Sequence, residues 1–165
     1  MPGSMYLSKC GSILVSVIVH IFGEAGFLPA QSEIERHLTH PDPELRRIAL
    51  NALILHWCVG HELRYIGVTY AQRCEEMFVS DPDEDVRRMA ATCLPFCYEK
   101  GRIDSRVGRL LAEVVRDASA NKYLRKSAYE SLFVVRDISP ELWPDFQFKF
   151  PDQVDWTFVD SFIPR

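Results

Sequence analysis

Residues 81–94 read Asp-Pro-Asp-Glu-Asp-Val-Arg-Arg-Met-Ala-Ala-Thr-Cys-Leu, a short acidic turn followed by an amphipathic segment. The same pattern occurs earlier at residues 40–53, and a weaker copy occupies residues 123–132. Its aligned arginines are 41 and then 38 residues apart, at Arg46, Arg87 and Arg125. A nearly constant period of this size is typical of stacked repeats. The sequence therefore predicts an array of similar units.

The composition is that of a soluble globular domain. The chain has 165 residues, of which 47% are apolar and 25% charged, and its net charge of −4 argues against the basic surface of a nucleic-acid binder. Its five cysteines include no CxxC pair, which favours a reducing compartment. The apolar run at residues 13–22 is too short to cross a bilayer, which takes about 20 residues. We expect a cytoplasmic protein with no membrane partner.

Each unit is expected to contain two helices. The first helices are predicted at residues 32–38, at 62–79 and after the N-cap Ser105, and the second helices after Asp42, Asp83 and Asn121. Asp and Asn favour these positions because their side-chain oxygens accept hydrogen bonds from free amides of the first helical turn. The second helix of the first unit should run to Gly60, and Pro95 should kink or end that of the second unit.

The ends of the chain differ from the repeats in composition. Residues 1–5, Met-Pro-Gly-Ser-Met, are interpreted as a cloning remnant, followed by a repeat domain at 6–138. Residues 12–22 are rich in Val and Ile, which favours a strand locally, but we expect a capping helix there because packing in a helical array overrides that preference.

Residues 139–165 contain seven of the thirteen Trp and Phe residues of the chain. So aromatic a segment should be buried against the exposed end of the array, and we expect it to form a C-terminal cap. Phe146, Phe148 and Phe150 alternate, which suggests a short extended segment, and residues 156–162 suggest a last helix.

The repeated pattern resembles the HEAT repeat over about residues 31–136: a turn, Asp or Asn, Val/Leu-Arg, Ala at plus four and Leu at plus eight. The resemblance implies an all-α fold, a short right-handed α–α solenoid of about three helix pairs with N- and C-terminal caps. It also implies a ladder of Asp and Arg side chains between neighbouring units. The matching positions are Asp42/Arg46, Asp83/Arg87 and Asn121/Arg125. We expect Arg46 and Arg87 to bind Asp42 or Asp83.

Two groups of residues contain side chains that commonly bind metals. His56-x-Cys58-x-x-His61-Glu62, with His37 and His40 one unit earlier, contains zinc-type ligands, but ordinary boundary histidines are the favoured interpretation because the group straddles a helix end and a turn. Cys93 and Cys97 lie on one helical face and could bind a metal or oxidise, although simple packing is favoured. We therefore expect no metal, no cofactor and no catalytic residue.

The solvent side of the second helices is the candidate binding surface. Its residues are Arg47, Asn51, Arg88, Thr92, Lys126, Tyr129 and Glu130. Stacked repeats present such a row as a continuous concave face that binds extended partners, although a plain solvated face is an alternative. We expect a non-catalytic, bacterial protein-binding module, of adaptor or immunity type, that is a monomer or weak dimer. HEAT-like enzymes, such as alkylpurine DNA glycosylases and bilin lyases, are the alternative class.

Overall fold

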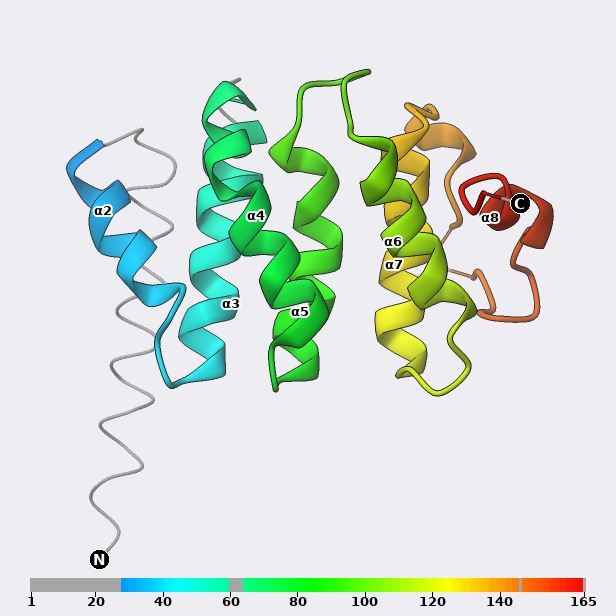
Figure 1. The fold of residues 1–165 in the computed structure, drawn as a ribbon, viewed down its shortest axis with the longest axis horizontal. Helices are drawn as coiled ribbons and strands as arrows, with labels where there is room; N and C mark the ends of the chain where they lie inside the picture. The colour runs from blue at the N-terminus through cyan, green and yellow to red at the C-terminus, as the bar shows by residue number, and fades with distance from the viewer. Residues whose placement is uncertain (1–27, 60–63, 146, 165) are drawn as a thin grey trace, which may run out of the picture.

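The computed structural model describes residues 28–59, 64–145 and 147–164, and every regular element in these ranges is helical (Figure 1). The expectation of an all-α protein is therefore confirmed. The capping helix predicted at residues 12–22 lies outside the described residues. None of the described helices combines the length and the apolar character needed to cross a bilayer.

The helices are α2 (Leu28–His37), α3 (Pro43–Asn51), α4 (Arg64–Ser80), α5 (Glu84–Cys93), α6 (Ser105–Arg116), α7 (Lys122–Val135) and α8 (Trp156–Asp160). A π-helical segment, Ala52–Val59, continues α3, and 3-10 helices lie at Leu94–Cys97 and Pro140–Leu142. Figure 1 shows the helices side by side in chain order from α2 to α8, with α4 and α5, and α6 and α7, running antiparallel.

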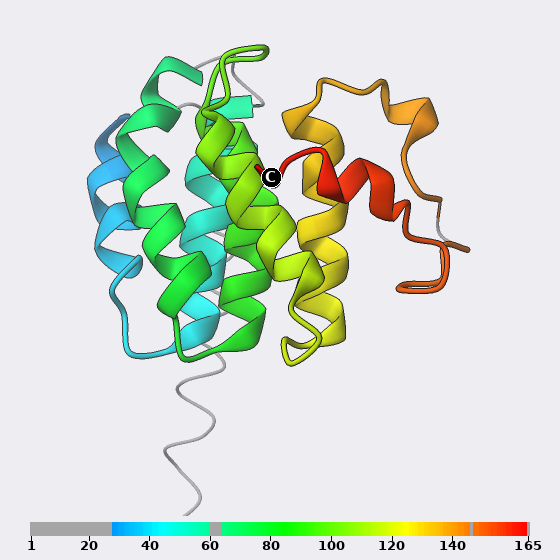
Figure 2. The same ribbon diagram turned by 45° about the vertical axis from the view of Figure 1, so that its right-hand side comes forward.

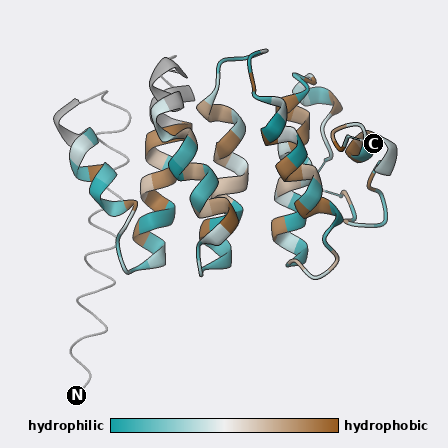
Figure 3. Cartoon of the chain, viewed as in Figure 1, coloured by the Kyte–Doolittle hydropathy of each residue, from teal (hydrophilic) through white to brown (hydrophobic). Residues whose placement is uncertain are grey.

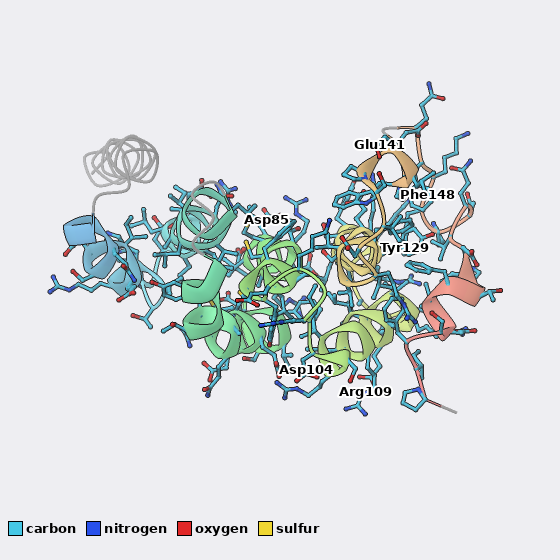
Figure 4. All side chains as sticks on the ribbon, turned by 90° about the horizontal axis from the view of Figure 1, so that it is seen from above. Asp85, Asp104, Arg109, Tyr129, Glu141 and Phe148 are labelled. Atoms are coloured by element: carbon cyan, nitrogen blue, oxygen red, sulfur yellow. The ribbon has the colours of Figure 1, made fainter. Side chains whose placement is uncertain are left out.

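Two layers of helices can be followed in Figures 2 and 4. Helices α3, α5 and α7 pack one against the next, while α4 packs against α5 and α6 packs against α7. We refer to α3, α5 and α7 as the second-helix layer. The three copies of the sequence pattern thus occupy corresponding places in one layer, and their N-terminal ends lie at the same edge of the molecule (Figure 1).

The helix starts agree with the sequence at three of four predicted caps. Asp42 accepts a hydrogen bond from Glu44 N, Asp83 from Asp85 N and Val86 N, and Asn121 from Tyr123 N. The prediction of Ser105 as a cap is wrong by one residue. The cap is Asp104, which accepts from Arg106 N at 2.8 Å, because a hydrogen bond to its charged carboxylate is stronger than one to the neutral hydroxyl of Ser105.

Two helix ends also depend on local chemistry. Helix α5 ends at Cys93 and continues as a 3-10 helix with Pro95 in its first turn, close to where that proline was expected to act. In the first unit the α-helix stops at Asn51, and the predicted remainder is a π-helix instead. Ala52, Leu53 and Ile54 are all buried there, so the segment is enclosed on several sides rather than along one stripe.

The core lies between the two layers and between successive units. Figure 3 shows brown apolar positions alternating with teal polar ones along each helix. Ala49, Ala90 and Ala128 hold the same repeat position and are at most 1% exposed. Their small side chains allow the helices to approach closely, and a larger residue would overpack the contact.

The C-terminal segment covers the end of this array. Phe148, Phe158 and Phe162 join Tyr129 and Phe133 of α7 in one aromatic cluster, with ring centroids 4.9–6.3 Å apart. The approach is close enough that a Cβ built on Gly108 of α6 would lie 2.5 Å from Phe162 Cδ1. The aromatic residues thus attach this segment to α6 and α7.

The C-terminal segment is less regular than the sequence suggested. Phe150 lies in a turn and Phe148 in irregular backbone, the described part of the segment contains no strand, and Phe146 is outside the described residues. The last helix, α8, is limited to Trp156–Asp160. Trp156 stays 37% exposed beneath the guanidinium of Arg116, whose Cζ lies 5.5 Å from its ring centroid.

Candidate interaction surface

Arg46 joins the first two units, but its carboxylate partner is Asp81, not Asp42 or Asp83 as expected. Its Nε and Nη2 donate to the two oxygens of Asp81 at 2.9 and 2.7 Å, and its Nη1 donates to the carbonyls of His40 and Pro41. The hydrogen bonds to Asp81 raise the pKa of Arg46 against the opposing effect of burial. Asp42 and Asp83 accept hydrogen bonds from the first-turn amides as helix caps, whereas Asp81 accepts from both Arg46 and the amide of Asp83.

The equivalent arginines make different contacts. Arg87 donates to Glu84 on its own helix, and its buried Nε has no hydrogen-bond partner. The residue 38 positions after Asp81 is Ser119, which offers no carboxylate. Arg125 donates from Nε to Val115 O and lies over the Phe150 ring, 5.1 Å from its centroid. Among the described residues, none of the expected side-chain pairs Asp42/Arg46, Asp83/Arg87 and Asn121/Arg125 is therefore formed, and the Arg46–Asp81 pair is not repeated in the next unit.

The cations of the predicted row are held by acidic neighbours on their own helices. Arg47 donates to Glu44 on α3, and Arg88 Nη2 lies 3.0 Å from Asp85 Oδ1 on α5. On α7, Lys126 Nζ is 3.7 Å from Glu130 Oε1. These are exposed or half-exposed pairs that contribute little to stability, so their charges stay available to a partner.

Tyr129 is a correction to the predicted row. It is only 3% exposed, its ring stacks on Phe148 with centroids 5.4 Å apart, and its hydroxyl accepts from Asp155 N (Figure 4). The C-terminal segment that was expected to cover the end of the array therefore also covers this face of α7. A partner cannot reach Tyr129 without displacing that segment.

The remaining residues of the row are half-buried. Asn51 lies at the end of α3, and Thr92 on α5 donates from its hydroxyl to Arg88 O. Glu130 is partly enclosed, and this burial raises the pKa of its carboxyl group although Lys126 opposes the effect. The row thus offers mixed charge and hydrogen-bonding groups rather than one sign of charge.

Two cavities adjoin the row where it meets the C-terminal segment. The first, about 190 Å³, is lined by Thr92, Glu130 and their neighbours together with Phe96 and Trp143. The second, about 360 Å³, shares Phe96 and Trp143 and continues to the Lys100–Asp137 ion pair. We refer to these two cavities as the Trp143 groove.

Sequence reasoning missed the Trp143 groove. The sequence predicts Trp143 in the terminal cap, but its indole Nε1 donates to Ile138 O at 2.8 Å, and its ring lines the cavity together with Phe96 of the 3-10 helix that follows α5. Pro140 and Pro144 flank this tryptophan and indicate a bent, non-helical segment. That signal was present, but it does not reveal which face the ring contacts.

The candidate metal ligands are only partly described. The structure does not describe the side chains of four of them, His56, Cys58, His61 and Glu62. The rings of His37 and His40 are 5.7 Å apart, and His40 Nδ1 accepts from Asp42 N. In the described part of the chain, no three His, Cys, Asp or Glu side chains are arranged to hold a metal ion.

The thiols lie in the core. Cys74, Cys93 and Cys97 are free and fully buried. Burial, together with the neighbouring Cys97, raises the pKa of Cys74 well above its usual range, so this thiol stays protonated at neutral pH. Such thiols pack as small apolar groups.

The chain matches no protein-family model, and no curated protein or solved structure is significantly similar to it. Its function must therefore be argued from its own residues.

Proposed function

We propose that this chain is a short right-handed α–α solenoid of three HEAT-like helix pairs that acts as a non-catalytic protein-binding module. The repeat is supported by two equivalent hydrogen bonds between neighbouring units. Cys93 Sγ lies 3.9 Å from Leu50 O, and Ser131 Oγ donates to Ala91 O at 2.9 Å. Cys93 and Ser131 occupy the same repeat position, as do Leu50 and Ala91 by the 41-residue period.

The observation that supports binding is the junction of the mixed-charge row with the Trp143 groove. Arg47 and Arg88 present guanidinium groups, Thr92 and Glu130 lie at the wall of the groove, and Trp143 supplies an aromatic surface. Protein interfaces commonly combine an apolar aromatic centre with a charged rim, and Trp and Arg are frequent energetic anchors. Tyr129, which is covered, is no longer part of the proposed surface.

The environment in this proposal is the cytoplasm of a bacterium. The three buried free thiols are compatible with a reducing compartment, where thiols stay reduced. Adaptor and immunity-type roles both fit such a module, since each needs a rigid surface and no chemistry.

The test is site-specific photo-crosslinking. A photoreactive residue at Thr92 should capture a defined protein partner, and Arg47→Glu with Arg88→Glu should abolish capture with little change in the melting temperature, because both side chains are surface groups. The control is Arg109→Glu on α6, whose exposed side chain lies in the other layer (Figure 4). Capture that persists in the double variant, or is equally lost in the control, refutes the proposal.

The same experiment addresses the enzyme alternative. Salt-sensitive binding of an oligonucleotide that is lost in the double variant would replace the protein-binding role with nucleic-acid recognition. We expect no such binding, because the row alternates both signs of charge and the chain as a whole has a net charge of −4.

A further inference from the structure

Another hollow, which does not include Trp143, adjoins the C-terminal segment. It has a volume of about 350 Å³ and forms where the first turns of α7 meet residues 148–152. Its lining residues are Lys122, Tyr123, Lys126, Phe148, Lys149, Phe150 and Asp152. We refer to this hollow as the lysine cleft.

Lys122 and Lys149 of the lysine cleft differ from most other cations that the structure describes, whereas Lys126 pairs with Glu130. Most Lys and Arg side chains that the structure describes form an ion pair, generally with an acidic residue three or four positions away. Among the described side chains, the exceptions are Lys122, Arg125, Lys149 and Arg136. The first three lie in or beside the cleft, since Arg125 stacks on the Phe150 ring. In a chain of net charge −4, this local excess of positive charge is unusual.

The cleft also has an aromatic surface. Tyr123 is 64% exposed, one of the few large apolar side chains so open to solvent in the described part of the chain. Phe148 forms part of the wall and is held by stacking on Tyr129. The cleft therefore presents an apolar surface with lysines from two separate segments around it, an arrangement that complements an apolar side chain flanked by carboxylates.

The surroundings of the cleft limit the length of its ligand. Asn121, next to Lys122, donates to Glu84 at 2.6 Å, and Glu84 belongs to the acidic turn that also contains Asp83 and Asp85. A long polyanion such as a nucleic acid would extend over this acidic edge and be repelled. A short acidic segment would be attracted by the lysines without reaching it.

We infer that the lysine cleft binds an acidic segment of a partner protein, with Asp or Glu side chains beside Lys122 and Lys149 and an apolar or aromatic side chain against Tyr123 and Phe148. This inference rests on the proposed protein-binding function and specifies the chemistry of the partner. It adds a second contact, which shares Lys126 with the row and lies apart from the Trp143 groove.

A random peptide library selected against the folded full chain tests the inference. Recovered peptides should be enriched in Asp and Glu around one apolar residue, and Lys122→Glu with Lys149→Glu should weaken their binding at least about tenfold in fluorescence anisotropy at low salt. Arg102→Glu is the matched control, because its exposed side chain lies outside the cleft lining. Should the double variant be poorly folded by circular dichroism, Lys122→Gln with Lys149→Gln replaces it.

Several results would overturn the inference. Recovered peptides without acidic enrichment, or acidic peptides that bind the double variant equally well, exclude the cleft. If a single-stranded oligonucleotide binds as tightly as the acidic peptides, the lysines recognise phosphate groups instead. Self-association that disappears in the double variant assigns the cleft to the acidic turn of a second copy.

The outcome is separable from that of the proposed function. Suppose that Arg47→Glu with Arg88→Glu abolishes photo-crosslinking at Thr92, while the lysine substitutions leave peptide binding unchanged. This result would support the proposed protein-binding function and exclude only the lysine cleft as a binding site.

Discussion

Arg46→Met should destabilise the protein far more than a surface charge deletion. The Arg46 and Asp81 side chains are only 10% and 5% exposed, and they connect the first two units through two direct hydrogen bonds. After the substitution Asp81 would remain buried, with the amide of Asp83 still donating to its Oδ1 at 3.0 Å but no cation beside it. Breaking a buried pair in this way typically costs about 3–5 kcal/mol.

A double-mutant cycle separates the pair from its surroundings. Arg46→Met, Asp81→Asn and the combined variant should give a coupling energy of about 1.5 kcal/mol or more by urea unfolding. The control cycle uses Glu33 and Arg36, whose N–O distance is 2.8 Å but whose side chains are 61% and 74% exposed. That exposed pair should couple by about 0.2–1 kcal/mol, because water screens it.

Arg46→Lys refines the result. Lysine keeps the charge but cannot place two donors on one carboxylate while also reaching the carbonyls of His40 and Pro41. The free energy of unfolding of Arg46→Lys should therefore lie between those of the wild type and Arg46→Met. A free energy of unfolding that falls by less than about 1 kcal/mol in Arg46→Met, or a coupling energy no larger than that of the control, would refute the assignment of this pair as a structural link.

Three further predictions concern the core, the row and the C-terminal segment. Ala90→Leu should lower the free energy of unfolding by about 1–3 kcal/mol because Ala90 is fully buried, and an unchanged melting temperature would contradict its placement. Burial raises the pKa of Glu130, so the folded protein retains its proton where the unfolded chain has lost it. Stability should therefore fall as the pH rises from the ordinary glutamate pKa to the raised one; Glu130→Gln should remove that fall in thermal melts, and an unaltered pH profile would count against it. Deleting residues 140–165 should expose Tyr129 and increase binding of a hydrophobic dye, whereas a truncated chain of equal stability that binds no dye would show that the cover is dispensable.

Local chemistry explains which features of the fold could be predicted from sequence. Asp42, Asp83 and Asn121 cap helices through bonds to amides two or three residues away, and Pro95 ends an α-helix by its own geometry. These effects operate within one turn, so the residues alone determine them. The error at Ser105 has the same origin: two neighbouring residues can cap, and the choice of Asp104 shifts the helix by one position.

The candidate surface depended on contacts between distant residues and was harder to predict. The acidic turn contains Asp81, Asp83, Glu84 and Asp85, and nothing in the sequence tells which of them Arg46 reaches. Only the stacking of α5 on α3 brings Asp81 to it. Tyr129 has a position typical of a solvent-facing residue by the repeat, but the path of the C-terminal segment buries it. That path depends on turns and aromatic contacts with no sequence period.

The open outer face of the third unit explains why the aromatic segment is needed. Between the first two units, the Arg46–Asp81 ion pair and the bonds from Tyr70 to Glu35 and from Arg73 to Leu38 O supplement the apolar contact. Between the second and third, Arg87 finds no carboxylate across the boundary, but Arg106 pairs with Glu75. Asn121 also donates to Glu84, and Ser131 donates to Ala91 O. Both boundaries therefore carry polar contacts, whereas the outer face of the third unit has no neighbouring repeat in the described part of the chain to cover it. The aromatic cluster on Tyr129 and Phe133 compensates on that face by burying α7 from the other side. The same segment forms one wall of both the Trp143 groove and the lysine cleft, so the part of the chain that stabilises the last unit also shapes the two surfaces proposed to bind a partner.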